Sequence, residues 1–448
     1  MRAVVLGGGI AGLTAGWALA SSGAETSVVE AAPFPGGLAS GFRDRGYTFD
    51  LFSHRLWTRD PEVLGLVESW VGAPLLARRK VSRILLDGRL YNYPIDLRDL
   101  LSVRSGRLAL RALAGYAGAR LTGGSGGEDY RAYLEARYGA PLFDTFFGPY
   151  TEKLTGCRAR ELSIDLALGA VPATGLVAQL VHRLIGRTDP WNDFLYPSRG
   201  FMEIPEGMAR ALRRAGGSLL LAHRLKAIRC RGNRVRRVEV ESADARLRIL
   251  PADLVVSTIP PAALLGALDP PPGGGAIEAA RRLRSRAMVA VYLGIRRPRL
   301  TEDHWIYVPD PSIRFNRLSE TTNYSEALAP PGCTGICAEI ACDFGDQVWR
   351  DDDGAQVARA VSDLVRLHLL RSGSEVEAAW VRRSAAAYPV YRVGYGDHLA
   401  AVEAGLRGLE NLATCGRQGA FWYGSTAQGI RQALDTVREI DRARARAA

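Results

Sequence analysis

Apolar positions in the first thirty residues form two short runs, separated by a glycine-rich turn and a helical stretch. The β-branched, apolar run over 1–6 predicts a buried strand, and a similar run over 26–29 predicts a second one. Between them, the Ala- and Leu-rich stretch that ends at Ala20 predicts a helix. The turn before this helix is Gly7-Gly8-Gly9-Ile10-Ala11-Gly12, and the second apolar run ends on Glu30.

This order of strand, glycine turn, helix, strand and acid is typical of a βαβ unit that binds a dinucleotide. In such a unit Gly7 makes the tight turn, Gly9 lets the backbone approach a pyrophosphate, and Gly12 lets helix and strand pack closely. The helix that starts at Ile10-Ala11 would point free N–H groups and its positive dipole end at the phosphates. We expect Glu30 to accept a hydrogen bond from a ribose hydroxyl.

The rest of the chain carries further helical and strand patterns. Helices are expected over 61–70, 97–120, 130–147 and 200–215, and from about Ala427 to the end. Strands are expected over 218–222, 235–241, 254–258, 288–293, 305–308, 335–342 and 412–414. At 448 residues the chain is longer than a single core supports, so we expect an α/β protein of two or more domains.

Composition narrows the class of protein. An apolar content of 47% and a charged content of 23% are ordinary for a soluble globular protein. Glycine, proline or arginine interrupts the longest apolar stretches well before the length of a membrane span. We expect the N-terminal apolar run to form the first strand and not a signal peptide. We expect a cytoplasmic protein without a membrane span.

The net charge of +11 comes almost wholly from arginine, because the lysines are only Lys80, Lys153 and Lys226. Since the arginines are scattered, a solvated basic face is the simplest interpretation, and attraction of an anionic substrate is the second. We expect no nucleic-acid partner. The six cysteines form no CxxC pair, so we expect no metal site, and Cys337 and Cys342 are predicted to be buried thiols.

The segment after the first βαβ unit indicates which dinucleotide is bound. Pro33-Phe34-Pro35-Gly36-Gly37-Leu38 is followed by the block 46–50 and by His54. These residues resemble the extended FAD motif of the superfamily of amine oxidases, protoporphyrinogen oxidases and UDP-galactopyranose mutases. The resemblance implies that FAD is the cofactor, that Gly36, Gly37 and Leu38 pass close to the flavin, and that His54 lies along it. The basic residue that many members carry before the Gly-Gly pair is absent here.

Later segments resemble the FAD domain of the same superfamily. There, the residue at Leu225 meets the adenine through its backbone, and Thr258 closes a strand near the pyrophosphate. Gly416-Arg417 resembles the closing motif, in which a strand delivers a Gly-Arg pair to the cofactor. Ala427-Gln428 begins the last helix, whose N-terminus would point at the pyrimidine edge of the flavin. A positive dipole end at this edge stabilises negative charge on the reduced flavin.

The resemblance implies a Rossmann-like FAD-binding domain of the p-hydroxybenzoate hydroxylase type, interleaved with an α+β substrate domain. The FAD-binding domain would be discontinuous and would comprise residues 1–75, 196–285 and 405–448. A helical substrate region would comprise 76–195, and a substrate-domain sheet would comprise 286–404.

Within the superfamily, the blocks 147–163, 283–285, 315–320 and 388–390 resemble UDP-galactopyranose mutase and its relatives. The resemblance implies that Tyr150 stacks on a nucleotide base, that Arg284 holds a diphosphate, and that flavin N5 is the reactive atom. The candidate substrate-binding residues are Tyr150, Arg284, Glu320, Tyr388 and Tyr423. The candidate catalytic residues are His54, Arg284 and Tyr388.

The chain also departs from the mutase pattern. Thr155 stands in place of the motif tryptophan, the segment 168–172 lacks the expected basic residues, and Ser425 and Ala427 replace two acids. The strand 286–293 contains no lysine, although polyamine-type amine oxidases place one near flavin N5. These departures favour net oxidation over a redox-neutral rearrangement.

We therefore expect an FAD-dependent oxidoreductase that transfers hydride to flavin N5 from a polar, sugar-derived or glycosylated small molecule. One form of this hypothesis has a substrate that is anionic or linked to a nucleotide. One alternative is a mutase-like, redox-neutral isomerisation of a sugar nucleotide. A second is oxidation or desaturation of an apolar or tetrapyrrole-like substrate, as in protoporphyrinogen oxidase. A third is a non-catalytic flavin-binding protein. The sequence leaves the oligomeric state open.

Overall fold

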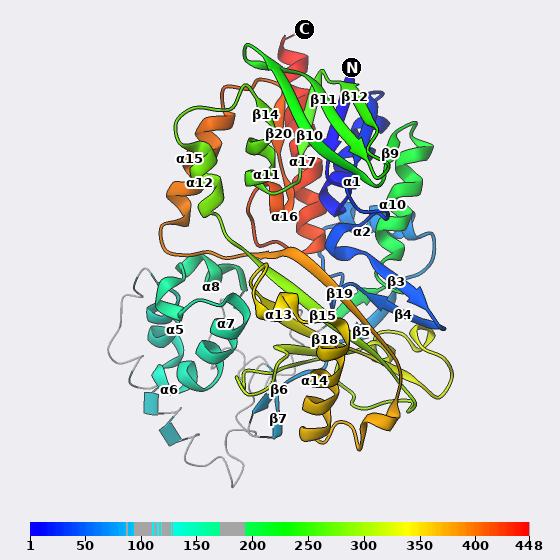
Figure 1. Ribbon diagram of the computed structural model, residues 1–448, viewed down its shortest axis with the longest axis vertical. Helices are drawn as coiled ribbons and strands as arrows, with labels where there is room; N and C mark the ends of the chain where they lie inside the picture. The colour runs from blue at the N-terminus through cyan, green and yellow to red at the C-terminus, as the bar shows by residue number, and fades with distance from the viewer. Residues whose placement is uncertain are drawn as a thin grey trace.

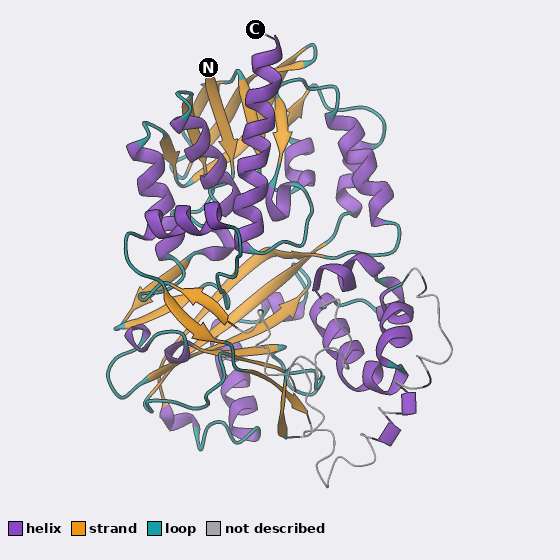
Figure 2. Cartoon of the chain, turned by 180° about the vertical axis from the view of Figure 1, so that it is seen from behind, coloured by secondary structure: helices purple, strands orange, loops and turns teal. Residues whose placement is uncertain are grey.

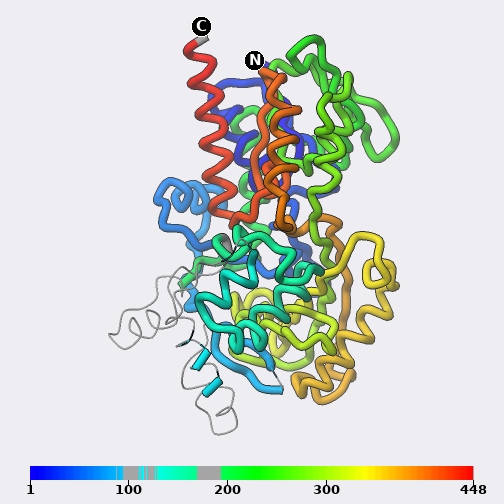
Figure 3. The backbone as a smooth tube through the Cα atoms, turned by 90° about the vertical axis from the view of Figure 1, so that its left-hand side faces the viewer, coloured from blue at the N-terminus to red at the C-terminus, as the bar shows by residue number. Residues whose placement is uncertain are grey.

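The computed structural model describes residues 1–86, 88–93, 110–111, 114–115, 118, 127, 129–170 and 193–447. The expected helix over 97–120 lies almost wholly outside these residues, as does part of the segment 168–172. Three sheets of four or more strands organise the described chain (Figure 1). Both termini lie at the same end of the molecule (Figure 3).

A five-stranded parallel sheet lies in the upper half of Figure 1. In spatial order its strands are β20 (Leu412–Thr414), β13 (Leu254–Ser257), β1 (Arg2–Leu6), β2 (Glu25–Val29) and β9 (Ser218–Leu220). The central strand β1 is apolar and almost fully buried from Ala3 to Leu6, as a parallel strand covered on both faces must be. Since the strands come from three distant parts of the sequence, both ends of the chain are needed to complete this sheet.

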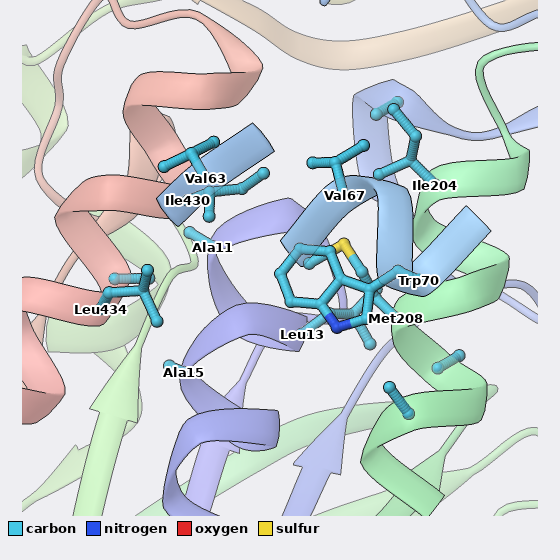
Figure 4. Close-up of a cluster of buried hydrophobic side chains, with 14 of the residues drawn as sticks. Ala11, Leu13, Ala15, Val63, Val67, Trp70, Ile204, Met208, Ile430 and Leu434 are labelled. Atoms are coloured by element: carbon cyan, nitrogen blue, oxygen red, sulfur yellow. The ribbon is translucent and has the colours of Figure 1, made fainter. Parts of the chain in front are cut away.

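Four helices pack together beside this sheet and form its largest core (Figure 4). They are α1 (Ile10–Ser21), α2 (Pro61–Val71), α10 (Glu203–Arg214) and α17 (Thr426–Ala447). Leu13 of α1 is fully buried and lies beside Trp70 and Met208, and Ile430 of α17 lies near Ala11. From behind, helices cross the near face of the sheet (Figure 2). In the part of the chain that the structure describes, no helix has the length and apolarity to cross a bilayer.

The ends of α2 are set by local sequence. The Asp60 carboxylate accepts hydrogen bonds from the N–H groups of Glu62 and Val63, and Pro61 occupies the first turn, where no N–H is needed. Gly72 ends the helix with φ of 71°, which is favourable only for glycine and a few other residues. These signals explain why the helix matches its expected range closely.

A four-stranded sheet extends this half of the molecule. Its order is β12 (Leu247–Pro251), β11 (Arg234–Ser242), β10 (His223–Arg231) and β14 (Leu268–Asp269). Its buried residues form a second core with α11 (Pro261–Gly266), α12 (Ala276–Arg282) and α15 (Tyr395–Leu406).

The seven-stranded sheet lies in the lower half of Figure 1, and its long strands β15 and β19 reach up to the first half. Its order is β19 (Val376–Pro389), β15 (Ser285–Ile295), β18 (Thr334–Cys342), β17 (Arg317–Glu320), β16 (Trp305–Tyr307), β6 (Ser82–Leu86) and β7 (Arg89–Asn92). All neighbours are antiparallel except β16 and β6. The helix α14 (Asp353–Arg366) covers one face of this sheet. The other face is directed at the half of the molecule that contains the parallel sheet.

Three strands occupy 76–79, 82–86 and 89–92, whereas the region 76–195 was expected to be helical. β6 and β7 join the seven-stranded sheet, and β5 (Leu76–Arg79) pairs with β8 (Asp193–Tyr196). The sequence carries a signal for this hairpin, because an Asp-Gly pair at 87–88 joins two apolar runs.

The remaining helical region packs beside this sheet. It consists of α5 (Tyr130–Tyr138), α6 (Ala140–Leu142), a π-helical turn (Phe143–Phe147), α7 (Gly148–Thr155) and α8 (Ile164–Ala170). The single helix expected over 130–147 is interrupted at Gly139, which has φ of 82°. Lys153 of α7 fixes this region to the sheet, since its Nζ donates to the carbonyls of Val308, Asp310 and Phe315 at 2.8–2.9 Å.

Candidate functional site

The glycine turn between β1 and α1 is shaped by close backbone contacts. Gly7 has φ of 101°, and a Cβ added there would lie 2.4 Å from Thr258 Oγ1. A Cβ on Gly12 would lie 1.8 Å from the carbonyl oxygen of Gly7. Thr258 Oγ1 donates to the Leu6 carbonyl at 2.9 Å, which ties the end of β13 to the turn. Both glycines are therefore required by packing at the start of α1.

Gly9, in contrast, faces open space. A Cβ added at Gly9 would meet only the Gly36 carbonyl oxygen, at 4.0 Å. The Gly36 N–H donates to the Gly8 carbonyl at 2.8 Å, and Gly37, with φ of 54°, lies against Gly9. Among the described residues no side chain caps the start of α1, and its first turn contains no acidic residue. An uncapped helix N-terminus beside two close glycine segments fits the pyrophosphate of FAD.

The closing segment lies against the same turn. Gly416 has φ of 82°, and a Cβ there would lie 2.7 Å from Ala11 Cβ. The Gly416 N–H donates to Gln432 Oε1 of α17 at 2.7 Å. The structure thus brings together three glycine segments that are far apart in sequence.

The other residues predicted to bind the cofactor lie on different elements and differ in burial. Leu225 is partly buried in β10 and pairs with Val240, and Leu38 packs with the aromatic core beside the seven-stranded sheet. Ala427 is buried in the first turn of α17. Gln428 is exposed, and its side chain accepts a hydrogen bond from the Ser425 N–H. Gln428 therefore organises the start of its own helix in this structure.

Glu30 joins the glycine turn to the end of β2. Its two carboxylate oxygens accept from the N–H groups of Gly8 and Ala32, each at 2.7 Å. A carboxylate has about four acceptor positions, so it can still accept from ribose hydroxyls.

Replacing Glu30 with alanine should weaken FAD binding about 10- to 100-fold, because a hydrogen bond to a charged group is worth about 1.5–3 kcal/mol. The measurement is a titration of apoprotein with FAD, followed by flavin fluorescence. Glu25→Ala, at the exposed start of the same strand, is the matched control and should bind FAD normally. Equal FAD affinity in both variants would contradict the role of Glu30.

A second group of residues surrounds Arg317 on the face of the seven-stranded sheet opposite α14. Arg317 Nη2 lies 2.5 Å from Glu339 Oε2, and Glu339 is only 1% exposed. Glu339 Oε1 also accepts from the Ser53 N–H at 2.9 Å. Burial disfavours the charge on Arg317, but Glu339 and the phenols of Tyr388 and Tyr150 hold its pKa well above the ordinary value. Arg317 is therefore a permanent buried cation.

Tyrosines lie around this cation. The rings of Tyr388 and Tyr423 are stacked with centroids 5.5 Å apart, and the Arg417 guanidinium lies 5.3 and 5.8 Å from them. Tyr150 contacts Tyr307 edge to face at 5.2 Å. Burial raises the pKa values of Tyr150 and Tyr423, so both phenols stay protonated at neutral pH. Because Gly416 touches α1 and Arg417 touches the tyrosines, one peptide bond links the glycine segments to this group.

We call the set of Arg317, Arg417, Tyr150, Tyr307, Tyr388 and Tyr423 the tyrosine–arginine cluster. Four of its members were predicted from sequence as site residues, namely Tyr150, Tyr388, Tyr423 and Arg417. Arg317 and Tyr307 were not predicted. Arg317 lies in the block 315–320 that resembles the mutases, so its signal was present. Tyr307 is the cross-strand neighbour of Arg317 in β16 and β17, a relation that only the register reveals.

His54 is partly buried near the two arginines. Its Nδ1 lies 2.8 Å from the Phe52 carbonyl oxygen, which can only accept, so Nδ1 carries the proton and Nε2 is a free acceptor. Its ring stacks on Phe201 at 5.1 Å. Burial lowers the pKa of His54 to about 4, and Arg417 and Arg317 lower it further against the hydrogen bond to Phe52.

His54 should consequently stay neutral throughout pH 5–8. The pKa of His54 in the folded protein is lower than its value of 6.5 in the unfolded chain. The contribution of His54 to the free energy of unfolding is therefore fully present above pH 6.5 and is lost as the pH falls toward 4. Nitrogen-15 NMR of the histidine rings should show an unchanged Nδ1–H signal across pH 5–8, assigned by its loss in His54→Gln. A His54 signal that titrates near pH 6.5 would refute this.

Arg284 is not placed with the tyrosine–arginine cluster. Its side chain is 43% exposed and forms an ion pair with Asp343 at 2.9 Å. The buried arginine of this segment is Arg286, whose Nη1 lies 2.7 Å from the same carboxylate and whose Nε donates to Leu154 O. A Cβ on Gly156 would lie 2.5 Å from Arg286 Nη1, so the glycine makes room for it. Arg286, and not Arg284, is thus the buried arginine of this segment.

Glu320 is also not in the cluster. Successive side chains of a strand point to opposite faces, so Glu320 and Arg317 face opposite sides of β17. The Glu320 carboxylate accepts from the N–H groups of Leu300 and Thr301 and from Thr334 Oγ1. In this structure Glu320 fixes a buried loop, and its role in substrate binding stays a prediction.

Comparison with known proteins places these features in a context. A family model described as flavin containing amine oxidoreductase matches residues 10–440. A reduced UDP-galactopyranose mutase is similar with a TM-score of 0.84 and 19% identity, over 98% of this chain and 93% of that one. A protein from Exiguobacterium sp. 255-15, described as a candidate protoporphyrinogen oxidase, gives 0.76 and 19%, over 98% of each chain. A redesigned putrescine oxidase gives 0.68 and 14%, over 98% of each. No curated protein sequence matches the chain.

Proposed function

Because the chain belongs to the flavin containing amine oxidoreductase family, we propose that it oxidises a polar, sugar-derived or glycosylated small molecule. It is an enzyme of the FAD-dependent oxidoreductase or mutase type, and FAD is its cofactor. When bound, FAD supplies the hydride acceptor at N5. The residues that would hold it are Gly7, Gly9, Gly12, Glu30, Gly36, Gly37, Thr258 and Gly416.

The observation that carries the polar substrate is the tyrosine–arginine cluster. Arg317 is a buried cation among phenols, and Arg417 lies over two of their rings. A guanidinium offers several N–H donors in a fixed plane, which suits phosphate, carboxylate or vicinal hydroxyls. Phenol rings add flat faces with a hydroxyl at one end. Arg317 already donates to Glu339, and Arg417 donates to the carbonyl oxygens of Gly424 and Ala387, so a polar substrate would bind the N–H groups that these contacts leave over.

In this proposal the protein binds and orients the substrate and accepts hydrogen bonds from it. His54 is suited to this, because its neutral Nε2 accepts a hydrogen bond while its low pKa keeps it from carrying charge. Tyr388 and Tyr423 would hold the substrate beside Arg417. The six cysteines are free thiols, which supports a reducing compartment, and we propose the cytoplasm.

A redox-neutral sugar rearrangement is the second candidate. The TM-score of 0.84 with a UDP-galactopyranose mutase over 98% of the chain favours it. The residues Ser425 and Ala427, which replace the two acids of the mutase motif, count against it.

The test is anaerobic mixing of holoenzyme with sugar nucleotides, aminoglycoside-like amines or porphyrinogens. We expect a sugar-derived or glycosylated compound to bleach the flavin absorption, and oxygen or another acceptor to restore it once per turnover. Bleaching by porphyrinogens alone would refute the proposal. A product isomeric with its substrate, formed only by pre-reduced enzyme, would establish the mutase reaction instead.

Tyr388→Phe should slow bleaching about tenfold, because the hydroxyl that accepts from Arg317 at 3.4 Å is lost from the cluster. Tyr395→Phe is the matched control: this tyrosine stacks on Tyr391 and bonds Asp165, outside the cluster. Stopped-flow absorbance of the flavin measures both variants. Equal rates in the two variants would remove Tyr388 from the site.

A further inference from the structure

A second group of cations and aromatic rings lies beside the tyrosine–arginine cluster, on the same face of the seven-stranded sheet. The Arg55 guanidinium lies 5.2 Å from the ring centroid of Trp305, and Lys80 Nζ lies 5.9 Å from the same centroid. Lys80 Nζ is also 5.3 Å from the ring of Tyr93. Two like charges thus meet over one indole ring.

Two buried donors in this group find no acceptor among the described residues. Arg55 Nη1 and Trp305 Nε1 are both inaccessible to solvent and make no hydrogen bond with the part of the chain that the structure describes. Trp305 is only 5% exposed. Among the described residues no carboxylate forms an ion pair with Arg55. Buried donors are almost always paired in folded proteins, so two adjacent unpaired ones indicate a missing acceptor.

The register connects this group to the tyrosine–arginine cluster. Trp305 and Tyr307 are two residues apart on β16, so their side chains share one face about 7 Å apart. Tyr307 lies opposite Arg317 of β17 and contacts both Tyr150 and Tyr93, at 5.2 and 5.0 Å. One molecule the size of a sugar residue could therefore contact both groups.

We propose that Arg55, Lys80 and the indole N–H of Trp305 form a subsite for an oxyanion carried by the substrate, separate from Arg317 and Arg417. A carboxylate or a phosphate ester satisfies the unpaired donors and the positive charge equally well. This inference rests on the proposed function, since it adds an acidic group to the polar substrate of the same site.

The test is calorimetric titration of oxidised holoenzyme with glucuronate, glucose 6-phosphate and neutral glucose. Both anionic probes should bind more tightly than glucose, and the better of the two identifies the acid. Arg55→Met should weaken the anionic probes about tenfold or more and leave glucose unchanged, because a charge-assisted hydrogen bond is lost. Arg79→Met, an exposed arginine of β5 next to Lys80, is the matched control and should bind all three probes normally.

Equal binding of charged and neutral probes, or no effect of Arg55→Met, would overturn the subsite. If Arg55→Met fails to retain FAD, Trp305→Phe removes only the indole donor and should still weaken the anionic probes selectively. These titrations require no turnover, so their failure is distinguishable from failure of the proposed oxidation, which flavin bleaching reports.

Discussion

Gly12→Ala should give a protein that fails to retain FAD. The added Cβ would lie 1.8 Å from the Gly7 carbonyl oxygen, a backbone atom that cannot yield without opening the turn. Overpacking of this kind costs about 3 kcal/mol or more, which corresponds to ~100-fold weaker FAD binding. The purified variant should be colourless, and titration with FAD should quantify the loss.

The matched control is Gly65→Ala in α2. A Cβ there meets nothing within 4 Å, and alanine favours a helix over glycine by about 0.5–1 kcal/mol. This variant should be yellow and slightly more stable to heat. A Gly12→Ala protein that is as yellow as Gly65→Ala would show that the turn does not hold the cofactor.

Arg317→Met should lower the free energy of unfolding by about 3–5 kcal/mol, because it leaves the Glu339 carboxylate buried without its cation. Thermal and chemical denaturation of the holoprotein measure the loss. The double variant Arg317→Met with Glu339→Gln should recover part of it, since glutamine carries no charge and can still accept from the Ser53 N–H. A double variant less stable than Arg317→Met would contradict this explanation.

The glycine segments could be predicted from sequence because their requirement is local. Gly7, Gly12 and Gly416 each adopt a backbone geometry or a contact that a side chain would block, and the motif around each glycine records it. The superfamily resemblance, the α/β fold with an FAD domain and the cofactor are confirmed by the family match and the similar structures. The assignment of individual residues to FAD stays a prediction.

Strand faces could not be predicted in the same way. Whether Arg317 or Glu320 points into the site depends on the register of β17 with β18 and on α14 covering one side. The choice between Arg284 and Arg286 depends on a register shift between Arg286 and Met288 and on Asp343, which is distant in sequence. These determinants are non-local, so a pattern within a few residues does not contain them.

The parallel sheet has a consequence for synthesis of the protein. β1 and α1 are synthesised long before β20, which pairs with β13, and before Gly416, which reaches Ala11. Domains usually fold as units during translation, beginning with the N-terminal one. Here the nascent chain must hold an unfinished cofactor-binding sheet, with an open strand edge at β13, until β20 has emerged. We therefore expect FAD capture to wait for β20, and cells short of flavin to accumulate the chain in this exposed form.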